Sequence, residues 1–369
     1  MPRSRILLIG AYGQFGRRIA VELARDDVDL VLAGRRLDRA QALAASLAGD
    51  ARLETARIDV EDGSLASDVA ALAPTLVIHT AGPFQQRDYR VAEAAMEAGA
   101  DYVDLADGRE FVAGVARLDA QARARGVRLV SGASSVPGLS GAVVAAHASR
   151  FAELHSVESA ISPGNRTERG LATTRAILGY VGRPFPALVD GRRRDVHGWQ
   201  SLRRIRHPAV GTRWVARCDV PDLDLLPHRY PSLRHCDFRA GLELRRMHFG
   251  LWLGSWAVRT GLVRDLSRHA KPLLHMSEYW LDAGSDTGVM TVDLAGTGLD
   301  GAPLRLRWSV VAREGSGPQI PATAAVVLAR RWRIERPAAG AGPCLDLFRL
   351  DDFMAALAGY PIDAATLVV

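Results

Sequence analysis

A glycine-rich turn near the start of the chain restricts the fold more than any other feature of the sequence. An apolar run of strand length, RILLI at residues 5–9, leads into GAYGQFG at residues 10–16, and apolar residues then recur at helical spacing. A strand, a glycine turn and a helix in this order open a dinucleotide-binding βαβ unit, although tight turns in other α/β proteins also use glycine. We expect nucleotide binding because the spacing G-x-x-G-x-x-G stands in the context that the motif requires.

Each glycine of this turn has its own expected role. Gly10 makes the tight turn, Gly13 lets the backbone approach a pyrophosphate, and Gly16 lets the helix pack on the strand. The N-terminus of the helix offers unpaired N–H groups and a positive dipole end to the same phosphate. The predicted cofactor-binding residues here are Gly10, Ala11, Tyr12, Gly13, Gln14, Phe15 and Gly16.

Strands and helices alternate through the next part of the chain, as in a doubly wound parallel sheet. Further strands are expected at 28–33, 53–60, 75–80, 101–105 and 127–131, and helices at 37–47, 89–98 and 111–125. Six strands by residue 131 make one complete Rossmann domain, which we place at residues 1–135.

The pattern changes after residue 132. A helix is expected at 134–147, followed by β-rich and irregular stretches in which 154–161, 189–197, 280–294 and 304–312 are strand-like, with helices at 172–181, 322–333 and 350–357. These elements predict a second, α+β domain with a mostly antiparallel sheet. We assign residues 136–320 to this substrate or dimerisation domain, and we expect the helices of 321–369 to return to the Rossmann domain.

The end of the second strand predicts which cofactor binds. NAD sites usually place an acid about 20 residues after the turn, where it holds the ribose 2′-hydroxyl. This chain has Arg35 and Arg36 there, and guanidinium groups suit a 2′-phosphate, so NADP is favoured over NAD. The alternative is that both arginines cap a solvated loop. Asp59 is either a partner of the adenine amino group or a helix-capping acid.

The fourth strand ends in a segment that should lie against the ribose and nicotinamide of a cofactor. The segment reads HTAGPF, in which glycine permits close backbone approach and proline stiffens the loop. Its predicted cofactor-binding residues are Thr80, Ala81, Gly82, Pro83 and Phe84.

Together these motifs resemble the saccharopine dehydrogenase-like family. The resemblance rests on the glycine turn, on HTAGPF, on GADYVD at 99–104 and on GASSVPG at 132–138, with GPQIPA at 317–322 as a return segment. It covers residues 5–140 well and the remaining chain thinly. It implies an NAD(P)-binding Rossmann domain, a fused α+β domain and hydride transfer, without implying saccharopine as the substrate.

Two absences narrow the reaction class. Short-chain dehydrogenases use a Tyr-x-x-x-Lys pair, but Lys271 is the only lysine and Ser267 stands four residues before it. No His, Cys or Glu residues have the spacing of metal ligands, so no metal site is expected. A protonated imine is already electrophilic and needs only hydride and positioning. The absence of a dedicated general acid therefore fits an imine reductase, and it fits a protein without enzymatic activity equally well.

Three polar residues after the fifth strand are the candidates for substrate contact. Asp104, Asp107 and Arg109 follow the strand at the edge where open α/β sheets bind ligands. A carboxylate there can orient a substrate amine or water, and the arginine can hold a substrate carboxylate. The alternative is an ordinary Asp-Gly turn followed by a surface charge.

Two stretches of the second domain stand out. Residues 183–217 hold nine arginines against two aspartates, which fits a solvated face, an anionic substrate or a membrane surface. No nucleic-acid motif accompanies them, so no nucleic-acid partner is expected. Residues 249–263 are apolar but too short to span a bilayer. We expect a buried helix there, with a homodimer contact or a membrane-surface helix as alternatives.

Composition agrees with a cytoplasmic location. The three cysteines are scattered and lack metal or redox spacing, as in reduced cytosolic proteins, and neither a signal peptide nor a transmembrane segment is expected. The sequence therefore predicts an NADP(H)-dependent oxidoreductase acting on a small imine, ketone or enoyl substrate in an interdomain cleft. The alternatives are a nucleotide-binding or sensing protein without turnover and a membrane-associated enoyl-type reductase.

Overall fold

The computed structural model describes residues 3–369, so the first two residues of the predicted domain 1–135 lie outside it. The chain forms two compact units. Unit 1 contains residues 3–138 and 319–348, and unit 2 contains residues 139–318 and 349–369. The predicted boundaries at 135 and 320 lie beside the observed ones. The final residues 349–369, however, belong to unit 2 and do not return to the nucleotide-binding domain.

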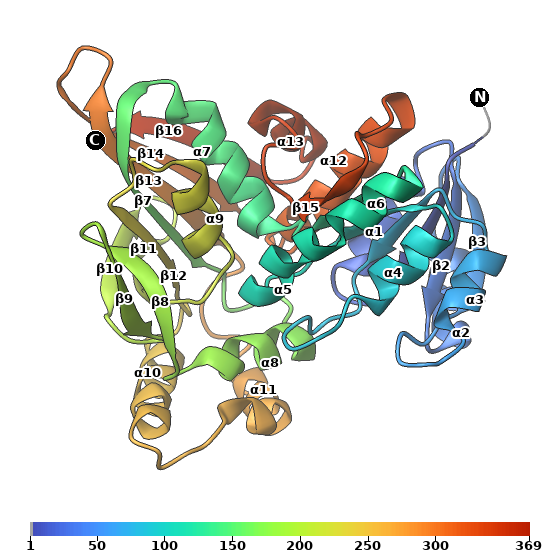
Figure 1. The fold of residues 1–369 in the computed structure, drawn as a ribbon. Helices are drawn as coiled ribbons and strands as arrows, with labels where there is room; N and C mark the ends of the chain where they lie inside the picture. Colours follow the sequence, from blue (N-terminus) through green and yellow to red (C-terminus); the bar gives the residue numbers. More distant parts are fainter. Residues whose placement is uncertain (1–2) are drawn as a thin grey trace. The chain divides into compact units, whose positions relative to one another are not determined.

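Unit 1 is built on a seven-stranded parallel sheet in the order β15-β6-β5-β4-β1-β2-β3 (Figure 1). Its strands are β1 (Arg5–Ile9), β2 (Asp29–Gly34), β3 (Arg52–Arg57), β4 (Leu76–His79), β5 (Asp101–Asp104), β6 (Arg128–Ser131) and β15 (Gly340–Pro343). The strand order reverses between β1 and β4, which makes their carboxyl ends the switch point of the sheet.

Helices cover both faces of this sheet because its central strands β1, β2 and β4 are apolar and buried. Leu7 and Ile9 of β1 pack in one core with α3 (Leu65–Ala71), α4 (Arg90–Glu97) and α6 (Asp119–Arg125). The alternate residues Ile6 and Leu8 point to the other face and are also fully buried. The remaining helices of unit 1 are α1 (Gly16–Leu23), α2 (Leu37–Ser46), α5 (Arg109–Gly114) and α12 (Gln319–Ile334).

The return segment 319–348 completes unit 1. Helix α12 packs beside α1, where the Arg330 guanidinium donates to Asp26 at 2.9 Å. Strand β15 pairs in parallel with β6, and the N–H of Ala341 donates to Asp119 at 2.8 Å. The predicted helix at 322–333 is thus present and belongs to this unit. The glycine-rich β15 has no apolar pattern and was not expected.

Unit 2 is an α+β unit with a nine-stranded mixed sheet, which confirms the predicted fold class together with unit 1. Its strands are β7 (Phe151–Ser162), β8 (Pro184–Val189), β9 (Arg192–His197), β10 (Arg203–His207), β11 (Gly211–Arg217), β12 (His235–Ala240), β13 (Gly288–Gly298), β14 (Pro303–Ala312) and β16 (Ile362–Val368). Only the β7–β12 pair is parallel on the main path of this sheet. Its helices are α7 (Ser140–Ala148), α8 (Leu171–Tyr180), α9 (Asp222–Arg229), α10 (Arg245–Arg259), α11 (Ala270–Glu278) and α13 (Leu350–Ala356).

Several elements differ from the sequence-based expectation for identifiable reasons. The helix expected from residue 134 begins in regular form only at Ser140, since Val136 precedes a proline and is extended, with φ −135° and ψ 130°. The helix expected at 111–125 is present as α5 and α6, which a 3-10 helix at Val115–Leu118 joins without interruption. The strand expected from residue 280 starts at Gly288, because Asn165 binds the carbonyls before it.

Candidate cofactor site and the arginine pocket

The glycine turn is closed by backbone hydrogen bonds between neighbouring strand ends. Gly10 has φ +84°, and its N–H donates to the carbonyl of Ala33 at the end of β2 at 2.8 Å. The N–H of Gly13 donates back to the Gly10 carbonyl at 2.9 Å. The Thr80 hydroxyl lies 3.0 Å from the carbonyl oxygen of Ile9 and 3.1 Å from that of Gly10. The turn is therefore fixed to both strands that flank β1.

The space around each glycine matches the predicted division of roles. A Cβ on Gly16 would lie 2.2 Å from the Gly10 carbonyl oxygen, so the start of α1 can approach β1 only with glycine there. A Cβ on Gly13 would meet only the Gly10 oxygen, at 3.1 Å, and its other side is open. An open glycine above a helix N-terminus is the cradle that a pyrophosphate needs, so the residues present fit a dinucleotide.

The end of β2 separates the two arginines that were predicted to select the cofactor. Arg36 makes a two-pronged ion pair with Asp38, with N···O distances of 3.2 and 2.7 Å. Arg35 is exposed, and its side chain has no hydrogen-bond or ion-pair partner among residues 3–369. Tyr12 lies against Gly34, and its hydroxyl accepts the N–H of Arg36 at 2.9 Å. Arg35 is thus the guanidinium available to a 2′-phosphate.

Asp59 lies two residues beyond the end of β3. One of its carboxylate oxygens accepts the N–H of Glu61 at 3.2 Å, so the side chain stabilises a local turn. Helix α3 starts after Ser64, which means that Asp59 caps no helix. Contact with an adenine amino group stays a prediction.

The loop after β4 is held by aromatic packing. The ring of Phe84 lies 5.0 Å from that of His79 and 5.5 Å from that of Phe111 in α5. Gln85 donates to Asp107 at 2.9 Å and so joins this loop to the loop after β5. Residues Ala81, Gly82 and Pro83, which lie between His79 and Phe84 in the chain, are half-buried. They are in position to contact a ligand at the carboxyl edge of the sheet.

Asp104 is fully buried and ties the loop after β5 to the end of β6. One carboxylate oxygen accepts the Ser131 hydroxyl and the N–H groups of Ala106 and Gly132, each at 2.9 Å. Burial raises the pKa of Asp104 to about 6, which these hydrogen bonds oppose. The other two candidates differ from it: Asp107 is half-buried, and Arg109 is buried at the start of α5.

A second polar contact lies beside this carboxylate. His79 of β4 is buried, and its Nδ1 lies 3.1 Å from the Tyr102 hydroxyl of β5. Burial lowers the pKa of His79 to about 4 and raises the pKa of Tyr102 well above its usual value. At neutral pH both rings are therefore uncharged, and neither is a ready source of protons. The sequence analysis missed Ser131 and Gln85, whose only signal is a polar side chain directly after a buried strand.

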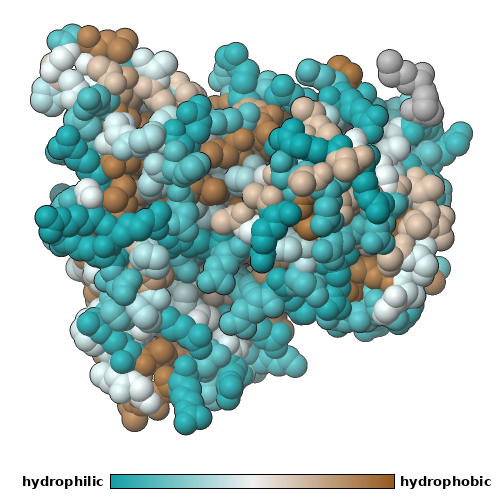
Figure 2. All heavy atoms as spheres, in the orientation of Figure 1, coloured by the Kyte–Doolittle hydropathy of each residue, from teal (hydrophilic) through white to brown (hydrophobic). Residues whose placement is uncertain are grey.

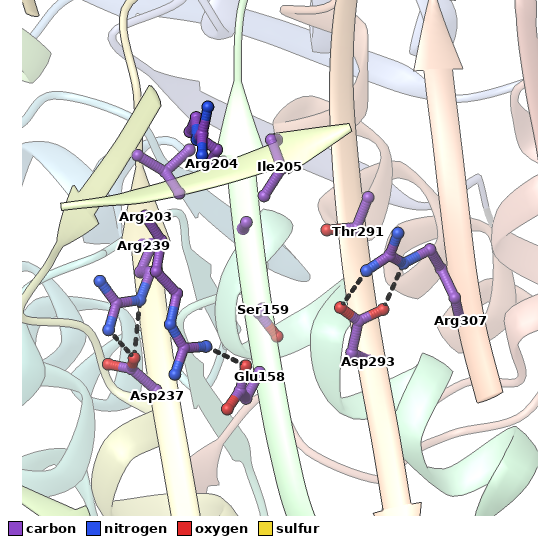
Figure 3. Close-up of a pocket in the computed structure, with 12 residues that line it drawn as sticks. Glu158, Ser159, Arg203, Arg204, Ile205, Asp237, Arg239, Thr291, Asp293 and Arg307 are labelled. Atoms are coloured by element: carbon purple, nitrogen blue, oxygen red, sulfur yellow. Dashed lines mark hydrogen bonds and ion pairs between the residues drawn. The ribbon is translucent and has the colours of Figure 1, made fainter. Parts of the chain in front are cut away.

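A pocket on the sheet of unit 2 is lined by paired charges, to which the arginine-rich stretch contributes Arg203. Figure 3 shows Asp237, Glu158 and Asp293 on the neighbouring strands β12, β7 and β13, which the strand register places side by side. Asp237 is paired with Arg239 at an N···O distance of 2.6 Å, and Glu158 is paired with Arg203. Asp293 accepts two hydrogen bonds from Arg307, at 2.6 and 2.7 Å. The pocket that they line has a volume of about 150 Å³.

These pairs change the interpretation of residues 183–217. Five of the nine arginines are ion-paired, namely Arg183, Arg193, Arg203, Arg213 and Arg217. Arg213 is buried, so this stretch is only in part the expected solvated face. An anion entering the pocket would compete with carboxylates already in place. Arg204 also lines the pocket, and its guanidinium lies 5.4 Å from the centre of the Trp214 ring. Binding of an anionic substrate stays a prediction.

The described chain offers neither a metal cluster nor a membrane-crossing helix. No three His, Cys, Asp or Glu side chains within residues 3–369 are grouped as a metal ion requires. No helix over the same residues is long and apolar enough to cross a membrane.

Comparison with known proteins identifies the first domain. Residues 6–130 match the family model for the saccharopine dehydrogenase NADP binding domain. Among solved structures, saccharopine dehydrogenase (L-Glu forming) from Saccharomyces cerevisiae has 14% identity and a TM-score of 0.67 over 99% of this chain and 100% of that one. Amine dehydrogenase from Mycobacterium smegmatis has 11% identity and a TM-score of 0.48 over 92% and 94%. No curated protein matches the chain.

The family match confirms two expectations drawn from the motifs. The matched range contains the glycine turn, HTAGPF and the strand that ends at Asp104. The resemblance to a dehydrogenase family and the assignment of NADP as the cofactor therefore hold for this domain. The likeness to the yeast enzyme extends the agreement to the fold of both units.

Proposed function

We propose that the chain is an NADP(H)-dependent oxidoreductase acting on a small imine, ketone or enoyl compound, because residues 6–130 match the model of the saccharopine dehydrogenase NADP binding domain. The observation that supports this most is the open cradle at Gly13 beside the unpaired Arg35. The nicotinamide cofactor supplies hydride chemistry when it is bound. The residues described above hold it and shape the place where hydride moves.

The imine is the substrate class that the carboxyl edge favours. Reduction of a carbonyl needs a proton donor for the oxygen, whereas a protonated imine is already activated. His79 and Tyr102 are buried and neutral, and Asp104 is fixed by three hydrogen bonds. None of the three is arranged as an accessible acid, and Asp107, with a pKa that burial raises, is the candidate carboxyl group with partly accessible surface.

We assign different roles to the three polar candidates after β5. Asp107 is the one with partly accessible surface, so it orients the amine or a water. Asp104 is a positioning residue that sets the loops after β5 and β6. Arg109, at the start of α5, contributes to holding a substrate carboxylate.

A substrate screen tests the proposed reaction. NADPH oxidation is followed with preformed imines, with carbonyl compounds with and without an amine, and with enoyl compounds. We expect turnover with imines or with carbonyl plus amine, and weak turnover with the carbonyl alone. Rapid reduction of simple ketones without an amine would show that the substrate class is a ketone and not an imine. NADPH binding without oxidation in the whole screen would favour a sensing protein instead.

The roles of Asp107 and Arg109 are separated by kinetics. If Arg109 contacts the substrate equally in the ground and transition states, Arg109→Ala raises KM more than it lowers kcat. Asp107→Asn should lower kcat/KM for amine-containing substrates and leave NADPH affinity unchanged. Unchanged kinetics in both variants would remove these residues from the site.

A further inference from the structure

Helices α10 and α11 present apolar side chains to solvent, although residues 249–263 were expected to form a buried helix. Only His248 and Ser255 of α10 are fully buried. Leu253 is 61% exposed, Trp256 is 42% exposed, and Leu262 just after the helix is 83% exposed. The expectation was wrong because only one side of this helix packs on the rest of unit 2, and its other side carries apolar residues that are exposed to solvent.

These residues are part of a local concentration of exposed apolar groups. Of the thirteen large apolar side chains that are exposed in the described chain, six lie between residues 253 and 281: Leu253, Trp256, Leu262, Met276, Tyr279 and Leu281. We call them the 253–281 surface. Figure 1 shows α10 and α11 at one end of unit 2, and Figure 2 shows apolar atoms gathered over α10 there. A patch of this kind marks an interaction site.

The charge around this surface is positive on balance. Residues 245–281 contain six basic residues and two acidic ones, so their net charge is +4. The six basic side chains are exposed: Arg245, Arg246, Arg259, Arg264, Arg268 and Lys271. Among them, Arg268 is attracted to Asp265, which has a lowered pKa. The two acids are already engaged, Asp265 with Arg183 and Glu278 with His275. This segment therefore combines a net positive charge with exposed apolar side chains.

Arginine and tryptophan are also combined as at a water–lipid boundary. The Arg259 guanidinium lies 5.1 Å from the ring centre of Trp256, and Arg246 lies 4.7 Å from that of Trp280. Such pairs place a charged group beside an aromatic ring that can enter an apolar layer. A 15-residue helix such as α10 is too short to span a bilayer but long enough to lie along its surface.

We propose that the 253–281 surface docks on an anionic lipid bilayer, with Leu253, Trp256 and Leu262 entering the headgroup boundary. A second copy of the chain fits less well, because a two-fold contact would bring two like-charged surfaces together. An anionic bilayer satisfies the six cations and the apolar side chains at once. This proposal is independent of the reaction, since none of these residues belongs to the cofactor site.

Vesicle flotation of the full chain tests the docking. We expect binding to vesicles of equal parts phosphatidylglycerol and phosphatidylcholine, little binding to phosphatidylcholine alone, and loss of binding between about 0.1 and 0.5 M NaCl. The double variant Leu253→Ser, Leu262→Ser should bind about tenfold more weakly. The matched control is Leu299→Ser with Ile334→Ser, which removes apolar groups that are 74% and 89% exposed elsewhere and should bind like the parent.

A charge reversal distinguishes local from general attraction. Arg264→Glu with Arg268→Glu should abolish flotation, whereas Arg192→Glu with Arg194→Glu, which changes the net charge equally on exposed positions of β9, should not. Equal loss in both pairs would overturn the proposal, as would no binding to anionic vesicles. If the Leu253 and Leu262 variant instead loses a concentration-dependent dimer, the occupant is a second copy. NADPH affinity should stay unchanged in every variant and serves as the folding control.

Discussion

Two adjacent arginines illustrate how surroundings decide function at the level of single residues. Arg35 and Arg36 look equivalent in the sequence, yet Arg36 is paired with Asp38 and Arg35 is not. A charge-assisted hydrogen bond contributes about 1.5–3 kcal/mol. A guanidinium without a competing carboxylate can give that energy to a 2′-phosphate, while a paired one must first lose its partner.

Arg35→Ala should therefore weaken NADPH binding by about ten- to a hundredfold and leave NADH binding almost unchanged. Arg36→Ala should have a clearly smaller effect. Titration of both cofactors by fluorescence measures the affinities, and Arg150→Ala, an exposed arginine of unit 2, is the control. Equal affinity of the parent protein for NADPH and NADH would contradict the assignment.

Gly13 provides a second prediction for a single residue. Gly13→Val should abolish NADPH binding and leave the fold largely intact, because the added side chain would occupy the open side of the cradle. Gly16→Val, by contrast, should destabilise unit 1, since its Cβ would meet the Gly10 carbonyl oxygen at 2.2 Å. Thermal unfolding and NADPH titration together distinguish the two outcomes. A Gly13 variant that binds NADPH normally would show that the turn is only structural.

At the level of elements, the sequence predicted those whose signal is local. The apolar run before Gly10 gave β1 with its observed bounds, and the periodicity of 37–47 gave α2 nearly in full. Elements that depend on distant partners were missed. Strand β15 is recognisable only through its pairing with β6, and the turns near Trp280 depend on Asn165 more than a hundred residues earlier.

The candidate site divides in the same way. Its glycines and strand ends follow from short motifs, whereas the contact between Gln85 and Asp107 and the pairing of Arg36 depend on side-chain orientation. The arginines of 183–217 could not be separated into paired and free groups without knowing that β7, β12 and β13 are neighbours. Composition alone gives the net charge of such a stretch, but it does not show which arginines form ion pairs with acids on neighbouring strands.

Helix α9 yields a prediction for pH. Asp222 is buried in its first turn, and the Ser140 hydroxyl is the side-chain hydrogen-bond donor beside its carboxyl group. Burial raises the pKa of Asp222 from 3.8 to about 7. The folded state thus retains a proton that the unfolded chain releases, so this residue lowers the free energy of unfolding as pH rises from about 4 to about 7.

The variant Asp222→Asn removes this dependence. It should be more stable than the parent near pH 8, by at most about 4 kcal/mol, and nearly equal to it near pH 4. Urea unfolding at both pH values measures the difference, and Asp195→Asn on an exposed position of β9 is the control. A constant difference between parent and variant at all pH values would contradict the assignment of a neutral carboxyl.

At the level of the whole molecule, the nucleotide-binding unit is discontinuous in sequence. Residues 319–348 return after the whole of the main body of unit 2 and supply α12 and β15. Without them the edge of β6 is unpaired, Asp26 loses Arg330, and the face of α1 that packs on α12 is exposed. Residues 6–130, which match the family model, are therefore a recognisable sequence but not a complete folding unit.

A fragment of residues 1–138 should consequently aggregate or unfold without cooperativity, and it should bind NADPH weakly. Joining residues 1–138 to 319–348 through a short Gly-Ser linker should restore cooperative unfolding and NADPH affinity close to that of the full chain. The design is feasible because Gly138 lies beside Ala324 of α12, where a Cβ on the glycine would be 3.4 Å from the alanine side chain. Circular dichroism and NADPH titration of both proteins measure the outcome. If the fragment 1–138 alone unfolds cooperatively and binds NADPH like the full chain, the return segment is an accessory and not a part of the nucleotide-binding unit.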